Sequence, residues 1–181
     1  MHILCTILFV GTLELTVDRR WRFRMKRAQS GFSLIELLIV VAIILIIAAI
    51  AVPSFLSSKM AANEASAVQS IRTINTGQAS YSVQFGQGFS TQLSNLGGSG
   101  TSASPTNALL IDNVVAGGTK DGYTFTYTVT ANDPDGNPSG YSINGNPVNP
   151  GSTGRRYFFS DQTFVIRVNP STAASLSDPA I

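Results

Sequence analysis

The chain has 181 residues, of which 44% are hydrophobic and 12% charged, and its formal net charge is +2. This length accommodates one ordinary domain with appended segments. Residues 1–31 carry a net charge of +4 and residues 32–181 a net charge of −2, so the overall positive charge gives no support for nucleic-acid binding. The only cysteine, Cys5, and the only histidine, His2, lie before residue 32. Everything after that point therefore lacks a disulfide and any thiol or imidazole chemistry.

The first 24 residues fit poorly with the rest of the chain. The apolar stretch Ile3–Val10 is too short to span a membrane, no basic residues precede it, and no small-residue cleavage site follows it. It therefore makes a poor secretory signal. We expect Met25 to be the initiator, residues 1–24 to be translated upstream sequence, and residues 25–31 (MKRAQSG) to form a short basic leader.

A long apolar run, residues 32–53, follows this leader and is interrupted by a single carboxylate, Glu36. A membrane-spanning helix needs roughly 20 apolar residues, so we interpret 32–53 as a transmembrane segment. The basic block before Phe32 predicts a cytoplasmic N-terminus, with the chain after Pro53 outside the cytoplasm. A charge at membrane depth costs at least ~2.5 kcal/mol, which makes Glu36 a candidate functional residue.

The helical pattern continues through residues 54–85, now with an amphipathic distribution. The positions expected to face a core are Val68, Ile71, Ile74, Tyr81 and Phe85, and the positions expected to face solvent are Ser66, Gln69, Thr73, Thr76, Ser80 and Gln84. Together the two halves predict one helix of roughly 80 Å at 1.5 Å per residue. Pro53 is its predicted kink.

Residues 86–121 are rich in Gly, Ser, Thr and Asn, and we interpret them as a long connection. It is expected to hold one short helix, capped by Ser104, started by Pro105 and stopped by Gly117. Residues 122–168 then carry strand signals. Gly122–Thr130 alternates aromatic residues with threonines, Asn132–Gly140 is typical of a turn, and RRYFFS and TFVIRV predict an antiparallel hairpin.

These patterns predict an α+β fold. The apolar half of a long N-terminal helix should protrude, and the amphipathic half should pack on an antiparallel sheet of three or four strands. Residues 169–181 are expected to form a tail that buries little.

The sequence GFSLIELL, preceded by a basic leader and followed by Pro53 after the apolar run, resembles the N-terminus of type IV pilins and of the related type II secretion pseudopilins. Three features carry the resemblance: Gly31 before the run, Phe32 opening it, and Glu36 as the fifth residue from Phe32. The fold of that family is a protruding helix on an antiparallel sheet, as the periodicities also predict.

The resemblance implies that a prepilin peptidase cleaves between Gly31 and Phe32 and that the new amino group of Phe32 is N-methylated. It also implies assembly into a helical homo-oligomeric filament through an inner-membrane assembly platform. The new amine would then pair with Glu36 of a neighbouring subunit. Two departures stand out: Leu45 replaces a glycine that loosens the helix in many pilins, and the C-terminal region lacks the usual disulfide.

Asp133, Asp135 and Asn137 resemble part of a calcium-binding loop, but no acid follows at the right distance and Gly136 is out of place. We therefore favour a plain hairpin turn and expect no metal. No grouping of residues after Phe32 suggests paired acid and base catalysis or a phosphate-binding loop, so we expect neither an enzyme nor a cofactor.

The interpretation that fits best is the major pilin of a type IV pilus, without direct nucleic-acid binding. It is expected in the inner membrane before assembly and on the cell surface afterwards. The alternatives within the family are a type II secretion pseudopilin and a minor or DNA-uptake pilin. From a different class, the alternative is a membrane-anchored periplasmic binding domain.

Overall fold

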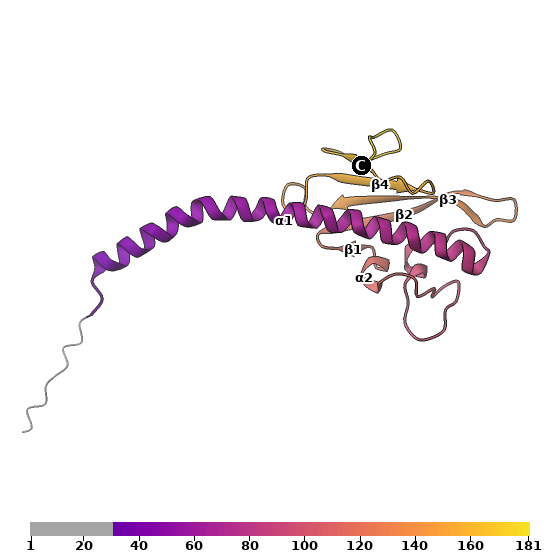
Figure 1. Ribbon diagram of the computed structural model, residues 1–181, viewed down its shortest axis with the longest axis horizontal. Helices are drawn as coiled ribbons and strands as arrows, with labels where there is room; N and C mark the ends of the chain where they lie inside the picture. The colour runs from indigo at the N-terminus through magenta and orange to yellow at the C-terminus, as the bar shows by residue number, and fades with distance from the viewer. Residues whose placement is uncertain (1–30) are drawn as a thin grey trace, which may run out of the picture. The chain divides into compact units, whose positions relative to one another are not determined.

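The computed structural model describes residues 31–181 (Figure 1). The described residues fall into two units whose boundary lies within the first helix, residues up to Val41 and residues Ala42–Ile181. In chain order the elements are helix α1 (Leu34–Phe85), a 3-10 turn η1 (Leu93–Leu96), helix α2 (Asn113–Ala116), and strands β1 (Thr119–Lys120), β2 (Tyr123–Asn132), β3 (Pro138–Pro147), β4 (Tyr157–Asp161) and β5 (Arg167–Asn169).

Helix α1 is 52 residues long and includes both Leu45 and Pro53 without a break. The single long helix predicted from the sequence is confirmed. It ends at Phe85 because Gly86 adopts a left-handed conformation, with φ of 64°, and donates its N–H to the carbonyl oxygen of Ser82. A glycine after the last helical residue adopts this conformation without steric cost.

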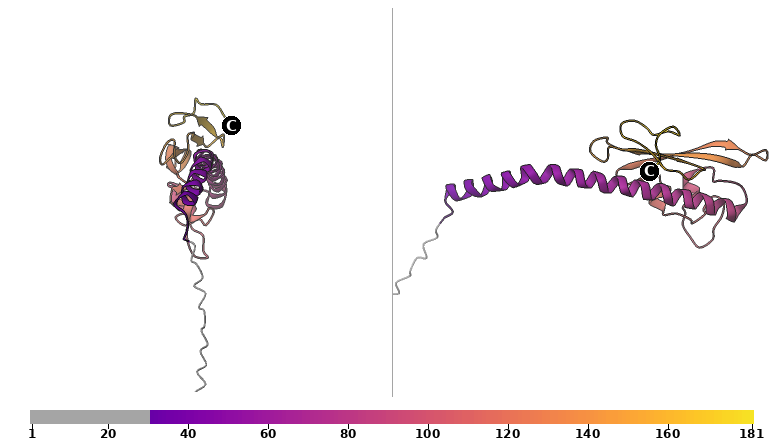
Figure 2. Two further views of the ribbon diagram at one scale, coloured as in Figure 1. Left: turned by 90° about the vertical axis from the view of Figure 1, so that its left-hand side faces the viewer. Right: turned by 45° about the horizontal axis from the view of Figure 1, so that its top comes forward.

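The sheet is fully antiparallel in the order β1-β2-β3-β4-β5. Figures 1 and 2 show it lying along one side of the second half of α1. The predicted α+β fold is confirmed, but five strands form instead of three or four. The additional strand is β1, whose two residues lie in the Gly- and Thr-rich connection and are too few to show a period-2 pattern.

Strand β3 pairs with β2 from Pro138 to Pro147, so it begins within Asn132–Gly140, the segment that was expected to form a turn. Beyond β5, the C-terminal tail is bound to the sheet edge. Val168 donates its N–H to the carbonyl oxygen of Pro179, and Ile181 donates to that of Ile166. The tail therefore covers an edge strand that would otherwise expose its backbone polar groups.

The core is built from one face of α1, the inner face of the sheet and the connecting loop. The helix contributes Ile71, Ile74 and Tyr81, as predicted, and Val68 and Phe85 are partly buried. The remaining core side chains include Tyr123, Phe125, Tyr141, Ile143 and Phe158 from the sheet and Leu93, Leu96, Ile111 and Val115 from the loop.

The loop packs closely on α1 at Gly77. A Cβ atom on this residue would lie 2.7 Å from Cγ2 of Ile111, which is too close for any larger residue without rearrangement. The loop thus occupies one flank of the helix, while the sheet occupies another.

The predicted start of the short helix at Ser104 and Pro105 is wrong. Ser104 and Asn107 exchange backbone hydrogen bonds of 3.0 Å in a turn, and Leu109 has a left-handed φ of 55°. The next amides donate to η1 and its flank: Ala108 to the Asn95 carbonyl oxygen and Leu110 to that of Leu96. Since tertiary bonds satisfy these amides, only Asn113–Ala116 is helical, followed by Gly117 as expected.

A buried carboxylate on α1 ties the helix to the loop before β4. Oε1 of Glu64 accepts the backbone N–H of Arg155 at 2.8 Å and that of Arg156 at 3.2 Å, while Oε2 accepts Nε of Arg156 at 2.7 Å. Beside it, Asn63 donates to the carbonyl oxygen of Thr153 at 2.8 Å. A carboxylate with this many donors is well compensated for its burial.

Further along α1, buried amide side chains bind the sheet and the loop. Asn75 donates to Oγ of Ser160 at 2.8 Å and accepts the hydroxyl of Tyr141 at 3.0 Å. Gln78 makes two bonds with Ser90, through its amide nitrogen at 2.8 Å and its oxygen at 2.9 Å. These directional bonds fix the rotation and register of α1 on its neighbours, in a region that has no disulfide.

We expect stability to fall at acidic pH through Glu64. Burial alone would raise the pKa of this carboxyl, but the donors from Arg155 and Arg156 and the charge of Arg156 lower it below its usual value. A pKa lowered by folding contributes stability above the unfolded-state value of 4.5. That stability is lost as pH falls through the folded-state pKa.

Glu64→Gln should lower the free energy of unfolding near neutral pH by about 1–3 kcal/mol, with a difference from wild type that shrinks on acidification. Denaturant unfolding of the detergent-solubilised chain over about pH 6 to about pH 3 measures this, with the exposed Asp135→Asn as control. A constant difference across the series would contradict the assignment.

Candidate functional site

Gly31 and Phe32, the predicted cleavage residues, lie immediately before α1. Both are outside the helix and exposed, Phe32 with 77% of its surface accessible, and a Cβ atom on Gly31 would meet no atom within 4 Å. A protease can bind a segment of this kind without unwinding a helix. Cleavage between these two residues and methylation of Phe32 remain predictions.

Glu36 closes the first turn of α1. Its Oε2 accepts the backbone N–H of Ser33 at 3.0 Å, and the carbonyl oxygen of Ser33 accepts the N–H of Leu37 at 3.2 Å. Ser33 is thus the residue flanking the helix, and Glu36 is the third residue inside it. This is the glutamate half of a capping box, in which an acid at that position satisfies a free amide and lies favourably at the positive end of the helix dipole.

The sequence analysis predicted no hydrogen-bond partner for Glu36 within its own chain, and the structure supplies one. The carboxylate has a local hydrogen-bond donor within its own chain. The pattern Ser33-Leu-Ile-Glu36 was the signal that could have revealed it. One amide does not neutralise the charge, so Glu36 still has the capacity to bind a cation.

The apolar part of α1 is exposed throughout. The large hydrophobic side chains of residues 34–56 each have between 44% and 76% of their surface accessible. By length and composition, α1 qualifies as a membrane-crossing helix. None of its most apolar 18-residue stretch is buried by the rest of the described chain. A stretch of this size needs lipid or protein around it.

Pro53 lies inside α1 and lacks the N–H of a regular helical residue. Two hydroxyls supply extra hydrogen bonds directly after it: Oγ of Ser57 donates to the carbonyl oxygen of Pro53 at 3.1 Å, and Oγ of Ser58 donates to that of Ser54 at 3.0 Å. The helix assignment is continuous here, and the kink at Pro53 stays a prediction.

The region around this site matches a known family model. Residues 26–52 match the prokaryotic N-terminal methylation motif. No curated protein gives a match, and neither does any solved structure. The matched stretch contains Gly31, Phe32 and Glu36.

The chain therefore carries the signature of type IV pilins and pseudopilins, at the start of an apolar helix. The long helix with its antiparallel sheet is the layout of the pilin fold.

Asp133, Asp135 and Asn137, which resemble part of a calcium-binding loop, lie in the turn between β2 and β3. Oδ1 of Asp133 accepts the backbone N–H groups of Asp135 at 3.0 Å and Asn137 at 2.8 Å, and Oδ2 accepts the side-chain amide of Asn137 at 3.2 Å. These bonds lower the pKa of Asp133, chiefly through the Asn137 amide. Within residues 31–181, no group of three acidic, histidine or cysteine side chains could hold a metal ion.

Because the carboxylate of Asp133 is used by the turn, Asp133→Ala should lower the melting temperature by the same amount in calcium and in a chelator. Thermal unfolding in the two buffers measures this. A stabilisation by calcium in the wild-type chain that disappears in Asp133→Ala would restore the calcium interpretation.

Proposed function

We propose that this chain is a prepilin and that its processed form, residues 32–181, is the major subunit of a type IV pilus. The observation that carries the proposal is the contrast within α1. One face of its second half packs into the core of the domain, whereas its first half is apolar on every side and covered by nothing in residues 31–181. A helix of this kind has to be enclosed either by lipid or by other copies of itself.

Lipid and neighbouring helices are both suitable surroundings for the apolar half. Burying one large aliphatic side chain contributes about 1.5–3 kcal/mol relative to leaving it in water, so exposure of many such side chains to water is excluded in either state. Transfer from the bilayer to a bundle of similar helices keeps them buried. Assembly can then proceed without a step in which the apolar helix is hydrated.

Glu36 supplies the polar interaction that differs between the two surroundings. Cleavage before Phe32 would remove the basic leader and create a cationic amine on Phe32, two residues before Leu34, the first residue of α1. The hydrogen bond from Ser33 holds the Glu36 carboxylate at the helix start, where the amine of a neighbouring subunit would find an acceptor. An apolar environment makes such a pair strong and makes an unpaired carboxylate costly.

The proposal places the protein in the inner membrane before assembly, with its N-terminus in the cytoplasm, and on the cell surface afterwards. Its partners would be the prepilin peptidase, an inner-membrane assembly platform and other copies of the same chain. The activity is assembly, as the signature of a structural family supports. No catalytic role is proposed.

We expect Glu36→Ala subunits to insert into the membrane and to be cleaved, yet to enter filaments at least tenfold less efficiently than wild type. Removing one partner of a buried ion pair costs about 3–5 kcal/mol, more than the ~1.4 kcal/mol needed for a factor of ten. Co-expression with wild-type subunits and quantification in sheared filaments measures this. Asp135→Asn, which removes an exposed turn carboxylate, serves as the matched control.

Incorporation of Glu36→Ala at the wild-type level would refute the charge-pair role.

The same fractionation distinguishes a major pilin from a pseudopilin, a minor pilin and an anchored binding domain. A major pilin dominates the sheared filaments, whereas a pseudopilin or minor pilin would be found in them only in traces. An unprocessed chain that stays in the membrane would instead indicate an anchored binding domain.

A further inference from the structure

Four of the six lysine and arginine residues after Phe32 gather around the part of α1 where the apolar segment gives way to the domain. They come from α1, from β1 and from the loop before β4. We call them the basic collar, and they are Lys59, Lys120, Arg155 and Arg156. The remaining two, Arg72 and Arg167, lie elsewhere, in the second half of α1 and in β5.

Contacts with Glu64 hold two members of the collar beside the helix. The carboxylate of Glu64 accepts Nε of Arg156 at 2.7 Å and the backbone N–H of Arg155 at 2.8 Å. Lys59 precedes Glu64 on the same helix by about 8 Å at 1.5 Å per residue. Lys59 and Arg155 are exposed, and 47% of the Arg156 side chain is accessible. The charged groups of these three residues therefore face solvent around one stretch of α1.

Lys120 lies in the same region through its position in β1. The carboxylate of its neighbour Asp121 accepts the hydroxyl of Ser66, which follows Glu64 on α1. Within residues 31–181, the only ion pair that a collar residue forms is that of Arg156 with Glu64. The collar thus has four positive charges against the two negative charges of Glu64 and Asp121, and three of its cations have no carboxylate partner in the described chain.

The opposite end of the sheet is acidic. Strand β2 begins beside the collar, where the hydroxyl of Tyr123 donates to the carbonyl oxygen of Arg156 at 2.8 Å. It ends about 30 Å away at 3.3 Å per residue, and Asp133 and Asp135 follow in the turn to β3. Figure 1 shows this turn at the end of the sheet that is remote from the apolar segment. The domain therefore has its positive end next to the apolar segment and a negative end away from it.

We propose that the basic collar binds the anionic head groups of phospholipids while the apolar segment of α1 lies in the bilayer. This inference rests on the membrane stage of the proposed function. The run of exposed large hydrophobic side chains ends at Leu56, which marks the outer border of the apolar segment. Lys59 lies about 5 Å beyond Leu56 along the helix. The head-group layer is roughly 5–8 Å thick on each side of a bilayer, so Lys59 falls within it.

The loop before β4 approaches the same layer from the side. Glu64, which binds this loop, lies about 12 Å beyond Leu56 along α1. Arginine side chains are long enough to extend their charged ends toward head groups, and membrane-spanning helices tilt by about 20° on average. A tilt toward the side of α1 that carries the sheet lowers the loop further. Val148, at the start of the loop, is 49% exposed and supplies an apolar side chain for the interface.

The position of the collar favours a membrane over any other anionic partner. Because the apolar segment holds the domain at the bilayer, the collar meets the head groups at a high effective concentration, and weak contacts suffice. Each lysine or arginine near an anionic surface strengthens the contact by roughly fivefold. The acidic turn at Asp133 and Asp135 is repelled by the same surface, so the charge distribution selects one orientation of the domain.

Fluorescence quenching by lipid head groups in nanodiscs tests the proposal. The full-length chain with Cys5→Ser and Ser152→Cys would carry a fluorophore at residue 152, an exposed position in the loop before β4. The nanodiscs would contain phosphatidylcholine, a lipid with a quencher on its head group, and either no phosphatidylglycerol or about 30% of it. Quenching should be roughly twofold stronger with phosphatidylglycerol. The difference should vanish in about 1 M salt, where charges are screened beyond ~3 Å.

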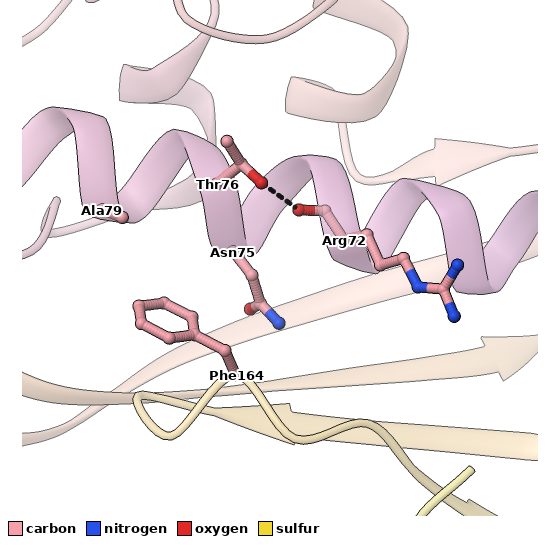
Figure 3. A pocket seen from close by; sticks show the side chains of 5 residues that line it. All are labelled: Arg72, Asn75, Thr76, Ala79 and Phe164. Atoms are coloured by element: carbon pink, nitrogen blue, oxygen red, sulfur yellow. Dashed lines mark hydrogen bonds between the residues drawn. The ribbon is translucent and has the colours of Figure 1, made fainter.

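Two variants assign the effect to the collar. Lys59→Gln and Arg155→Gln each remove one exposed cation, and each should lower the ratio of docked to undocked domain by about fivefold, seen as weaker quenching with phosphatidylglycerol. Arg72→Gln is the matched control. Arg72 lies on α1 about 20 Å beyond Lys59 and lines a hollow with Asn75 and Phe164 (Figure 3), so its removal should leave the quenching unchanged.

Equal quenching in the two lipid compositions would overturn the head-group assignment while leaving the proposed function intact. An equal loss in Arg72→Gln would also overturn it, since the effect would then follow net charge and not the collar. Full quenching in Lys59→Gln and Arg155→Gln, combined with a lower yield of filaments in cells, would assign these cations to a neighbouring subunit instead. A wild-type chain that does not insert into nanodiscs would refute the membrane stage of the proposed function, on which this inference depends.

Discussion

The lack of any cover for the apolar half of α1 is the constraint on which the rest of the structure depends. A continuous helix of 52 residues carries large hydrophobic side chains on all sides of its first half and a single acid near its start. The hydrophobic effect does not allow such a surface to stay in water. Under the proposed function, the remainder of the chain is a domain that stays folded while this segment moves between lipid and protein surroundings.

The domain meets that requirement with directional polar contacts instead of a disulfide. Glu64 binds the loop before β4, and Asn75 and Gln78 bind the sheet and the loop from inside the core. An apolar contact alone would tolerate rotation or sliding of the helix, but these hydrogen bonds are satisfied in one register only. They therefore hold α1 in one rotation and one register against the sheet and the loop.

Much of this could be predicted from the sequence because two patterns dominate it. The apolar run and the alternation of aromatic residues with threonines in β2 are long enough to define a helix and a strand. The methylation motif, which the family comparison confirms, is local and needs no tertiary information. Gly31, Phe32 and Glu36 lie within this motif, and their roles stay predictions.

Features that depend on tertiary structure escaped prediction. The helix expected from Ser104 was lost because its amides bind the carbonyl groups near η1, which are close only in the folded chain. The burial of Glu64, Asn75 and Gln78 contradicts the usual preference of polar side chains for solvent and is possible because each has a partner far away in sequence. The conformation of Phe164 and its position beside α1 likewise depend on the turn held by Asp161.

The most direct test of the account is the intact mass of the subunit in filaments sheared from the cell surface. The account predicts one dominant species with the mass of residues 32–181 carrying one additional methyl group on the amine of Phe32. That result would establish the cleavage site, the modification and surface assembly together. A chain that retains the residues before Phe32, or that is lacking from the sheared fraction of a cell that makes filaments, would contradict it.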